Sequence, residues 1–113
     1  EMDAMLLPEP QATKARLEQH VKLFDSRDKN LQLGVVAFRK KILSEPRRKD
    51  QVAKFIKAYN IAVDSINSRG VQHYASIITK YTGADAKTIS NLPKLKYEHA
   101  MEPRRRDLAV AQK

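Results

Sequence analysis

A single carboxylate near the start of the chain stands between two prolines, in Asp3-Ala4-Met5-Leu6-Leu7-Pro8-Glu9-Pro10. Each proline fixes φ and removes a backbone donor, so the chain around Glu9 is stiff. The apolar run before it is long enough for a buried strand, and open α/β sheets bind ligands beyond the carboxyl ends of their strands. A carboxylate in this position accepts hydrogen bonds from a ligand or from neighbouring backbone amides. Glu9 and Pro10 are therefore candidate ligand-binding residues.

Side chains that typically carry out catalysis or bind metals show no recognised spacing. The histidines at 20, 73 and 99 are far apart and none belongs to a metal-binding motif such as HExxH. No serine lies in a GxSxG sequence, and cysteine is absent, which excludes disulfides and thiolate chemistry. The three glycines are too widely spaced to form a phosphate-binding loop. The sequence predicts no catalytic residue, no metal site and no cofactor.

Positive charge is the most prominent feature of the composition. The 113 residues carry 22 Lys and Arg against 13 Asp and Glu, a net charge of +9. One run follows Pro103, at Arg104–Arg106, and a larger group surrounds Pro46: Arg39, Lys40, Lys41, Arg47, Arg48 and Lys49. Such clusters are typical of nucleic-acid binding, which is the alternative function. Most aromatic residues fall at core spacing and not among these cations, so stacking platforms for bases are not predicted.

Three short segments have the composition of β-strands. The first is the apolar run before Pro8, and the second is Val21–Asp25, which ends on turn-forming residues. The third, Leu31–Phe38, contains β-branched residues and a glycine typical of a bulge. A short helix is predicted over Thr13–His20, between the first two strands. This order predicts an α/β chain.

A long amphipathic helix is predicted over Pro46–Arg69, after a single helical turn at Arg39–Leu43. Its 24 residues would span about 36 Å. Ser44 is the N-cap candidate, and Gly70 is a natural residue to follow the last turn. The apolar side chains recur at steps of three and four: Val52, Phe55, Ile56, Tyr59, Ala62, Val63 and Ile66.

Two shorter helices are predicted beyond Gly70. The first covers Val71–Tyr81 and is closed by Thr82-Gly83. Asp85 is placed to cap the second, which Pro93 ends. No transmembrane span or signal peptide is found. Because a chain opening on Glu1 lacks a natural start, we expect a leader or a larger N-terminal region to precede it.

Several of these segments, in this order, resemble the C-terminal portion of periplasmic solute-binding proteins of ABC transporters. The similar group carries sulfonates, taurine, nitrate and thiamine-pyrimidine precursors. The resemblance extends over nearly all residues and rests on order and spacing. The matching stretches are Asp3–Pro10, Val21–Ser26, Gly34–Pro46, the long-helix sequence Ala58–Asn67 (AYNIAVDSIN), Lys80–Gly83 (KYTG) and Asn91–Pro93 (NLP).

The resemblance implies the C-terminal fragment of a two-lobed periplasmic-binding-protein fold of type II. Three short strands would be followed by three or more helices. Residues 1–38 would form the strand-rich part of the second lobe and the crossing strand, and residues 39–113 the helical part that packs on the first lobe. Since the first lobe is missing, apolar faces would be uncovered. We therefore expect the isolated chain to form a homo-oligomer.

The implied function is that of the substrate-binding component of an ABC-type importer. It would capture a small anionic or zwitterionic solute, such as a sulfonate, nitrate or a pyrimidine-like molecule, and deliver it to the membrane permease. Glu9 and Pro10 would line the cleft. The implied location is the periplasm, or the cell surface as a lipoprotein. Enzymes of the same fold make the thiamine pyrimidine, but their activity requires histidine and cysteine features that this sequence lacks.

Overall fold

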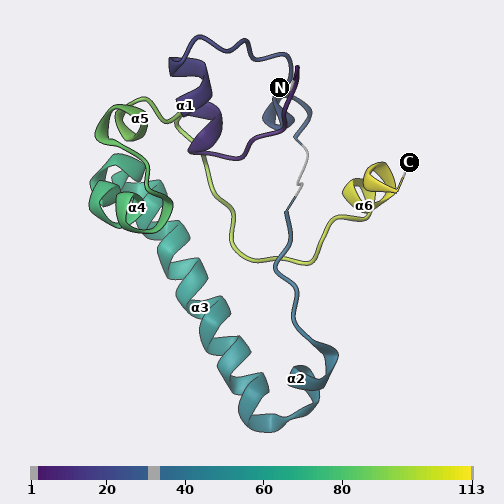
Figure 1. Cartoon of the computed structure of the whole chain (residues 1–113). Helices are drawn as coiled ribbons and strands as arrows, with labels where there is room; N and C mark the ends of the chain where they lie inside the picture. Colours follow the sequence, from purple (N-terminus) through teal and green to yellow (C-terminus); the bar gives the residue numbers. More distant parts are fainter. Residues whose placement is uncertain (1–2, 31–33, 113) are drawn as a thin grey trace. The chain divides into compact units, whose positions relative to one another are not determined.

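The computed structural model describes residues 3–30 and 34–112, and every regular element within them is a helix (Figure 1). In chain order the elements are α1 (Gln11–Leu17), the 3-10 helix η1 (Ser26–Lys29), α2 (Lys40–Ser44), α3 (Pro46–Arg69), the 3-10 helix η2 (Val71–Tyr74), α4 (Ala75–Thr82), α5 (Ala86–Ser90) and α6 (Arg105–Ala111). None of the helices in this described part is long and apolar enough to cross a membrane.

The chain divides into two compact units. The first consists of the described residues of Glu1–Lys22 together with Asp64–Tyr97. The second consists of the described residues of Leu23–Val63 together with those of Glu98–Lys113. The division falls within α3, so this helix contributes to both units.

The α/β class predicted from the sequence is wrong, because the described residues contain no β-strand. The predicted strand residues 4–7, 21–24 and 35–38 have no regular structure, and Leu6, Val21 and Leu23 are more than four-fifths exposed. Leu31–Leu33, at the start of the third predicted strand, lie outside the described residues. β-Propensity reflects how well a residue fits a pleated, half-buried surface, so it depends on a neighbouring strand. None of the three segments has a neighbouring strand among the described residues, so no strand forms there.

The helices predicted from periodicity are largely confirmed. α3 spans Pro46–Arg69, and Gly70 follows it with φ 82°, where glycine avoids the cost of a Cβ. The predicted helix after Gly70 is divided into η2 and α4, and Gly83 ends α4 in the left-handed conformation. Ser44 is the last residue of α2 and donates its hydroxyl hydrogen bond to the Lys41 carbonyl. It therefore does not act as the predicted N-cap of α3.

The first unit has a small, well-defined core. α5 contacts α1, α4 and η2, and α4 also contacts η2. The buried residues are Thr13 on α1, Ala84 in the link after α4, and Thr88 and Ile89 on α5. The Arg16 guanidinium also donates to the Asn91 carbonyl oxygen at 3.3 Å, which ties α1 to the end of α5. α5, although only five residues long, is the centre of this unit.

The second unit is also held by polar contacts. Among its described residues, Val63 and Asp107 are buried. Arg104 pairs with Asp107 at 2.6 Å and donates to the carbonyl oxygen of Asn30 at 2.9 Å, so α6 is linked to the end of η1. Phe38 meets Phe55 edge-to-face, with ring centroids 5.8 Å apart, which anchors the extended segment before α2 to α3.

Candidate functional site

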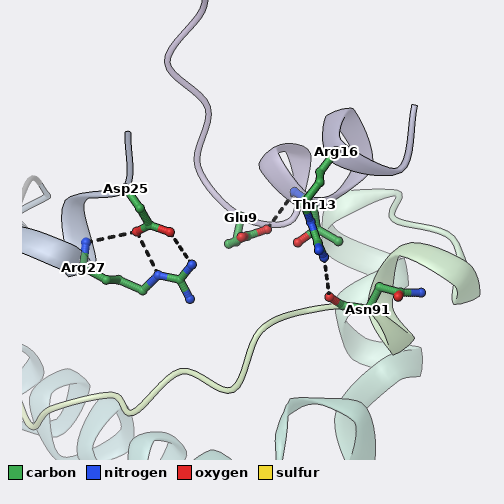
Figure 2. Close-up of polar contacts among 6 residues, drawn as sticks. All are labelled: Glu9, Thr13, Arg16, Asp25, Arg27 and Asn91. Carbon is green, nitrogen blue, oxygen red and sulfur yellow. Dashed lines mark hydrogen bonds and ion pairs between the residues drawn. The ribbon is translucent and has the colours of Figure 1, made fainter. Parts of the chain in front are cut away.

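Glu9 lies two residues before the start of α1 and is half-buried. Its Oε2 atom accepts a hydrogen bond from the backbone N–H of Thr13 at 3.1 Å, and Figure 2 shows the carboxylate turned toward that nitrogen. The first backbone N–H groups of a helix have no partner within the helix, so a carboxylate here stabilises the start of α1. The sequence allowed Glu9 to accept hydrogen bonds from a ligand or from neighbouring backbone amides. In the structure, it accepts one from a backbone amide.

Pro10 lines a small open pocket in the first unit. The pocket has a volume of about 140 Å³, and its lining residues are Pro10, Gln11, Lys14, Thr82, Gly83, Ala84 and Thr88. Pockets for drug-sized ligands occupy roughly 300–1,000 Å³, so this one suits a solute of only a few heavy atoms. Pro10 thus lies at a cavity, whereas Glu9 is not among its lining residues.

Three short structural features build the walls of the pocket. α1 contributes Gln11 and Lys14 one turn apart on the same face. The left-handed Gly83 turns the chain from α4 toward α5. The Thr82 hydroxyl donates to the Ile78 carbonyl and accepts the Ala84 N–H, which fixes this turn.

The electrostatics of the pocket depend on Lys14 and on Asp85, which lies just outside it. Lys14 is the one charged residue among the described residues lining the pocket. The backbone N–H of Thr88 donates to Asp85 at 2.7 Å, and this bond is the main reason that the Asp85 pKa is lowered. The Thr88 hydroxyl and the charges of Lys14 and Lys87 lower that pKa further. Asp85 is therefore a fixed anion committed to capping α5, and Lys14 supplies the positive charge of the pocket.

The side chains that line the pocket are suited to binding a small ligand. Its polar groups are one ammonium, one amide and two hydroxyls, and the Thr82 hydroxyl is already committed to the backbone. The described residues contain no group of three His, Cys, Asp or Glu side chains arranged to hold a metal ion. A small ligand with a negative group would find Lys14 on one wall and apolar Pro10 and Ala84 on the others.

Sequence reasoning missed the role of two asparagines in α3. Asn67 and the backbone of Tyr97 exchange two hydrogen bonds in the first unit, at 2.8 and 3.0 Å. In the second unit, Asn60 Oδ1 accepts the Ala100 N–H at 2.9 Å. Both asparagines hold extended chain that lacks a helical or sheet partner. The available signal was their seven-residue spacing, which puts both at the same edge of the apolar stripe.

The two basic clusters are placed differently. In the cluster after Pro103, Arg104 and Arg106 both donate to the Asn30 carbonyl oxygen, and Arg104 also pairs with Asp107. Two of its three arginines therefore have structural contacts. Around Pro46, Arg48 pairs with Glu45 at 3.0 Å, with both side chains about half exposed. The remaining cations of that cluster are exposed at the surface of the second unit.

Comparison with known proteins gives no further assignment: no family model, no curated protein and no solved structure matches this chain.

Proposed function

We propose that the chain belongs to the substrate-binding component of an ABC-type importer, located in the periplasm or at the cell surface. It captures a small anionic or zwitterionic solute for delivery to a membrane permease. The pocket beside Pro10 is the part of the described chain that contacts this solute. The proposal rests on the resemblance in motif order and on one observation about the first unit.

That observation is the meeting of two distant motifs at one cavity. Pro10 ends the first matching stretch, and Thr82-Gly83 end the KYTG stretch more than seventy residues later. Both stretches line the same pocket. The NLP stretch lies nearby, because its Asn91 carbonyl accepts the Arg16 hydrogen bond from α1. Motifs that act together in ligand binding are expected to converge in this way, and here the packing of α1 on α5 brings them together.

The pocket also supports the proposed class of solute. Lys14 gives it a positive charge, and the net charge of +9 favours the approach of anions. Its volume of about 140 Å³ suits a small sulfonate or nitrate. Because the pocket is open to solvent, the ion pair with Lys14 is screened, and we expect weak binding that declines with added salt.

A titration of the full chain with taurine and with nitrate, followed by amide NMR, tests the proposal. We expect saturable shifts at Gln11 and Gly83, and we expect Lys14→Ala to weaken binding about two- to fivefold, the loss of one solvent-screened charge contact. Lys87→Ala is the matched control, since Lys87 also lies near Asp85 but does not line the pocket.

Two results would contradict the proposal. If no sulfonate, nitrate or pyrimidine shifts these amides or raises the melting temperature, the proposed function fails. If Lys87→Ala weakens binding as much as Lys14→Ala, the anions bind through general charge and the pocket is not the site.

A further inference from the structure

We propose that the second unit binds the surface of an anionic lipid membrane. The contact is made by the α2 surface, which we define as Val35, Val36, Leu43 and the six cations Arg39, Lys40, Lys41, Arg47, Arg48 and Lys49. This proposal is independent of the pocket beside Pro10, because all of these residues belong to the second unit.

The first ground is dense and available positive charge. Residues 39–49 contain six basic side chains and one acidic side chain, Glu45, and all six basic residues are exposed. Among the described residues, Arg48 pairs with Glu45, and the other five cations make no ion pair. Only Glu45 separates α2 from α3, so the two halves of the cluster stay together in space (Figure 1). Clusters of four to eight cations are attracted to anionic headgroups, by about 1 kcal/mol for each charge.

The second ground is the exposed apolar side chains that lie within a few residues of these cations in the sequence. Val35 and Val36 are 64% and 63% exposed, and Leu43 is 48% exposed. Phe38, which follows the two valines closely in the sequence, packs against Phe55 on α3 and so anchors this segment. Apolar groups beside cations are typical of proteins that lie in the membrane interface. A nucleic-acid duplex offers phosphates to the cations but little apolar surface to the valines, so the combination favours lipid.

Flotation of the full chain with vesicles provides the test. We expect the chain to bind vesicles of equal parts phosphatidylglycerol and phosphatidylcholine, and to bind pure phosphatidylcholine at least about tenfold more weakly. The triple variant Arg47→Glu, Arg48→Glu, Lys49→Glu should lose at least about tenfold in binding to the anionic vesicles. The control Lys87→Glu, Lys94→Glu, Lys96→Glu makes the same change in net charge in the first unit. It should change binding less than about threefold, through long-range charge alone.

A melting curve distinguishes lost binding from lost folding. The three cations lie in the first turn of α3, which contains no acidic residue, and positive charge is unfavourable at the start of a helix. The triple variant should therefore melt no earlier than the unmodified chain while binding lipid more weakly. Equal loss of vesicle binding in the control variant would overturn the proposal, because general attraction would then explain the result.

A second variant separates lipid from nucleic acid. Val35→Ser with Val36→Ser leaves every charge in place, and we expect it to weaken vesicle binding several-fold while leaving binding to duplex DNA unchanged. If the serine variant binds vesicles as well as the unmodified chain, and duplex DNA binds more tightly than vesicles, the α2 surface is a nucleic-acid contact and the lipid proposal is wrong.

Discussion

The two units of the chain are stabilised in different ways. The first unit buries Thr13, Ala84, Thr88 and Ile89 around α5. The second buries Val63 and Asp107, and side-chain bonds from Arg104 and Asn60 to backbone atoms hold its extended parts. The first unit, in which α5 packs against α1 and α4, contains a small pocket. Both units expose large apolar side chains, and in the second unit Val35, Val36 and Leu43 lie close in sequence to the cations of residues 39–49, which suits contact with an extended surface.

The largest expected effect compares a buried apolar residue of the first unit with a half-exposed one of the second. Ile89 in the first unit is 2% exposed, whereas Phe55 in the second is larger but 49% exposed. We expect Ile89→Ala to lower the free energy of unfolding by about 2–4 kcal/mol, through lost burial and a cavity. Phe55→Ala should cost less than about 1.5 kcal/mol, since much of its ring is already in water. Urea unfolding of both variants measures the difference. Equal costs would show that the units do not differ as described.

The next effect concerns the polar contacts of the second unit. Arg104 pairs with Asp107, whose Oδ1 atom is buried without a hydrogen bond within the described structure. Arg104→Gln weakens this pairing and the bond to Asn30, so we expect a loss of about 1–3 kcal/mol and faster amide hydrogen exchange in α6. Arg105→Gln is the control, because it removes the same charge from an exposed position. If the two variants exchange at the same rate, Arg104 does not hold α6.

The exposed stripe of α3 leads to a prediction about self-association. Ile56 and Tyr59 on the stripe are 37% and 40% exposed, and burial between two copies would remove them from water. We expect Ile56→Glu to weaken self-association about tenfold, as measured by sedimentation. Ile61→Glu carries the same change and lies about 140° around the helix, so it should have a smaller effect. Light scattering from a clean monomer at high concentration would contradict this prediction.

The sequence predicted most accurately those elements whose signals are local. Periodicity with Pro46 and Gly70 located both ends of α3, and Asp85 was identified as the cap of α5. The predicted strands failed because β-propensity requires a partner strand, which no local pattern supplies. Pro10 was placed among ligand-binding candidates and does line a pocket, but Lys14 and Gly83 were missed. Their proximity results from the packing of α1 on α5, a long-range contact that single-residue patterns do not encode.

A smaller effect depends on pH and on the capping of α5. The Thr88 N–H bond lowers the Asp85 pKa, so the folded state favours the carboxylate. The stabilisation that the ionised Asp85 gives to the folded state is present above its ordinary pKa of 3.8. It is lost as the pH falls through the lowered pKa of the folded state. Asp85→Asn keeps a capping oxygen without the titration. The melting temperature of this variant should therefore approach that of the unmodified chain in acid. A temperature difference that is constant down to the lowest pH would exclude this role.

The smallest expected effect is at the end of α1. The sequence predicted a helix up to His20, whereas α1 ends at Leu17 in the structure. The N–H groups of Gln19 and His20 bond back to the Arg16 and Ala15 carbonyls, the pattern of a Schellman motif. Gln19 has φ 70°, a conformation that glycine usually adopts, so no glycine marks the end of this helix in the sequence. Gln19→Gly relieves the strain but adds freedom to the unfolded chain, so we expect a gain below about 1 kcal/mol.

Glu18→Gly is the matched control for that change. Glu18 has φ −89°, which an ordinary side chain adopts without strain, so glycine there should only destabilise the chain. The two neighbouring substitutions are therefore expected to shift the melting temperature in opposite directions. Because α1 carries Lys14, a first unit stabilised by Gln19→Gly should also hold the pocket more firmly and bind a small anion at least as well. A loss of stability in the Gln19→Gly variant would mean that the glutamine side chain contributes more than its backbone conformation costs.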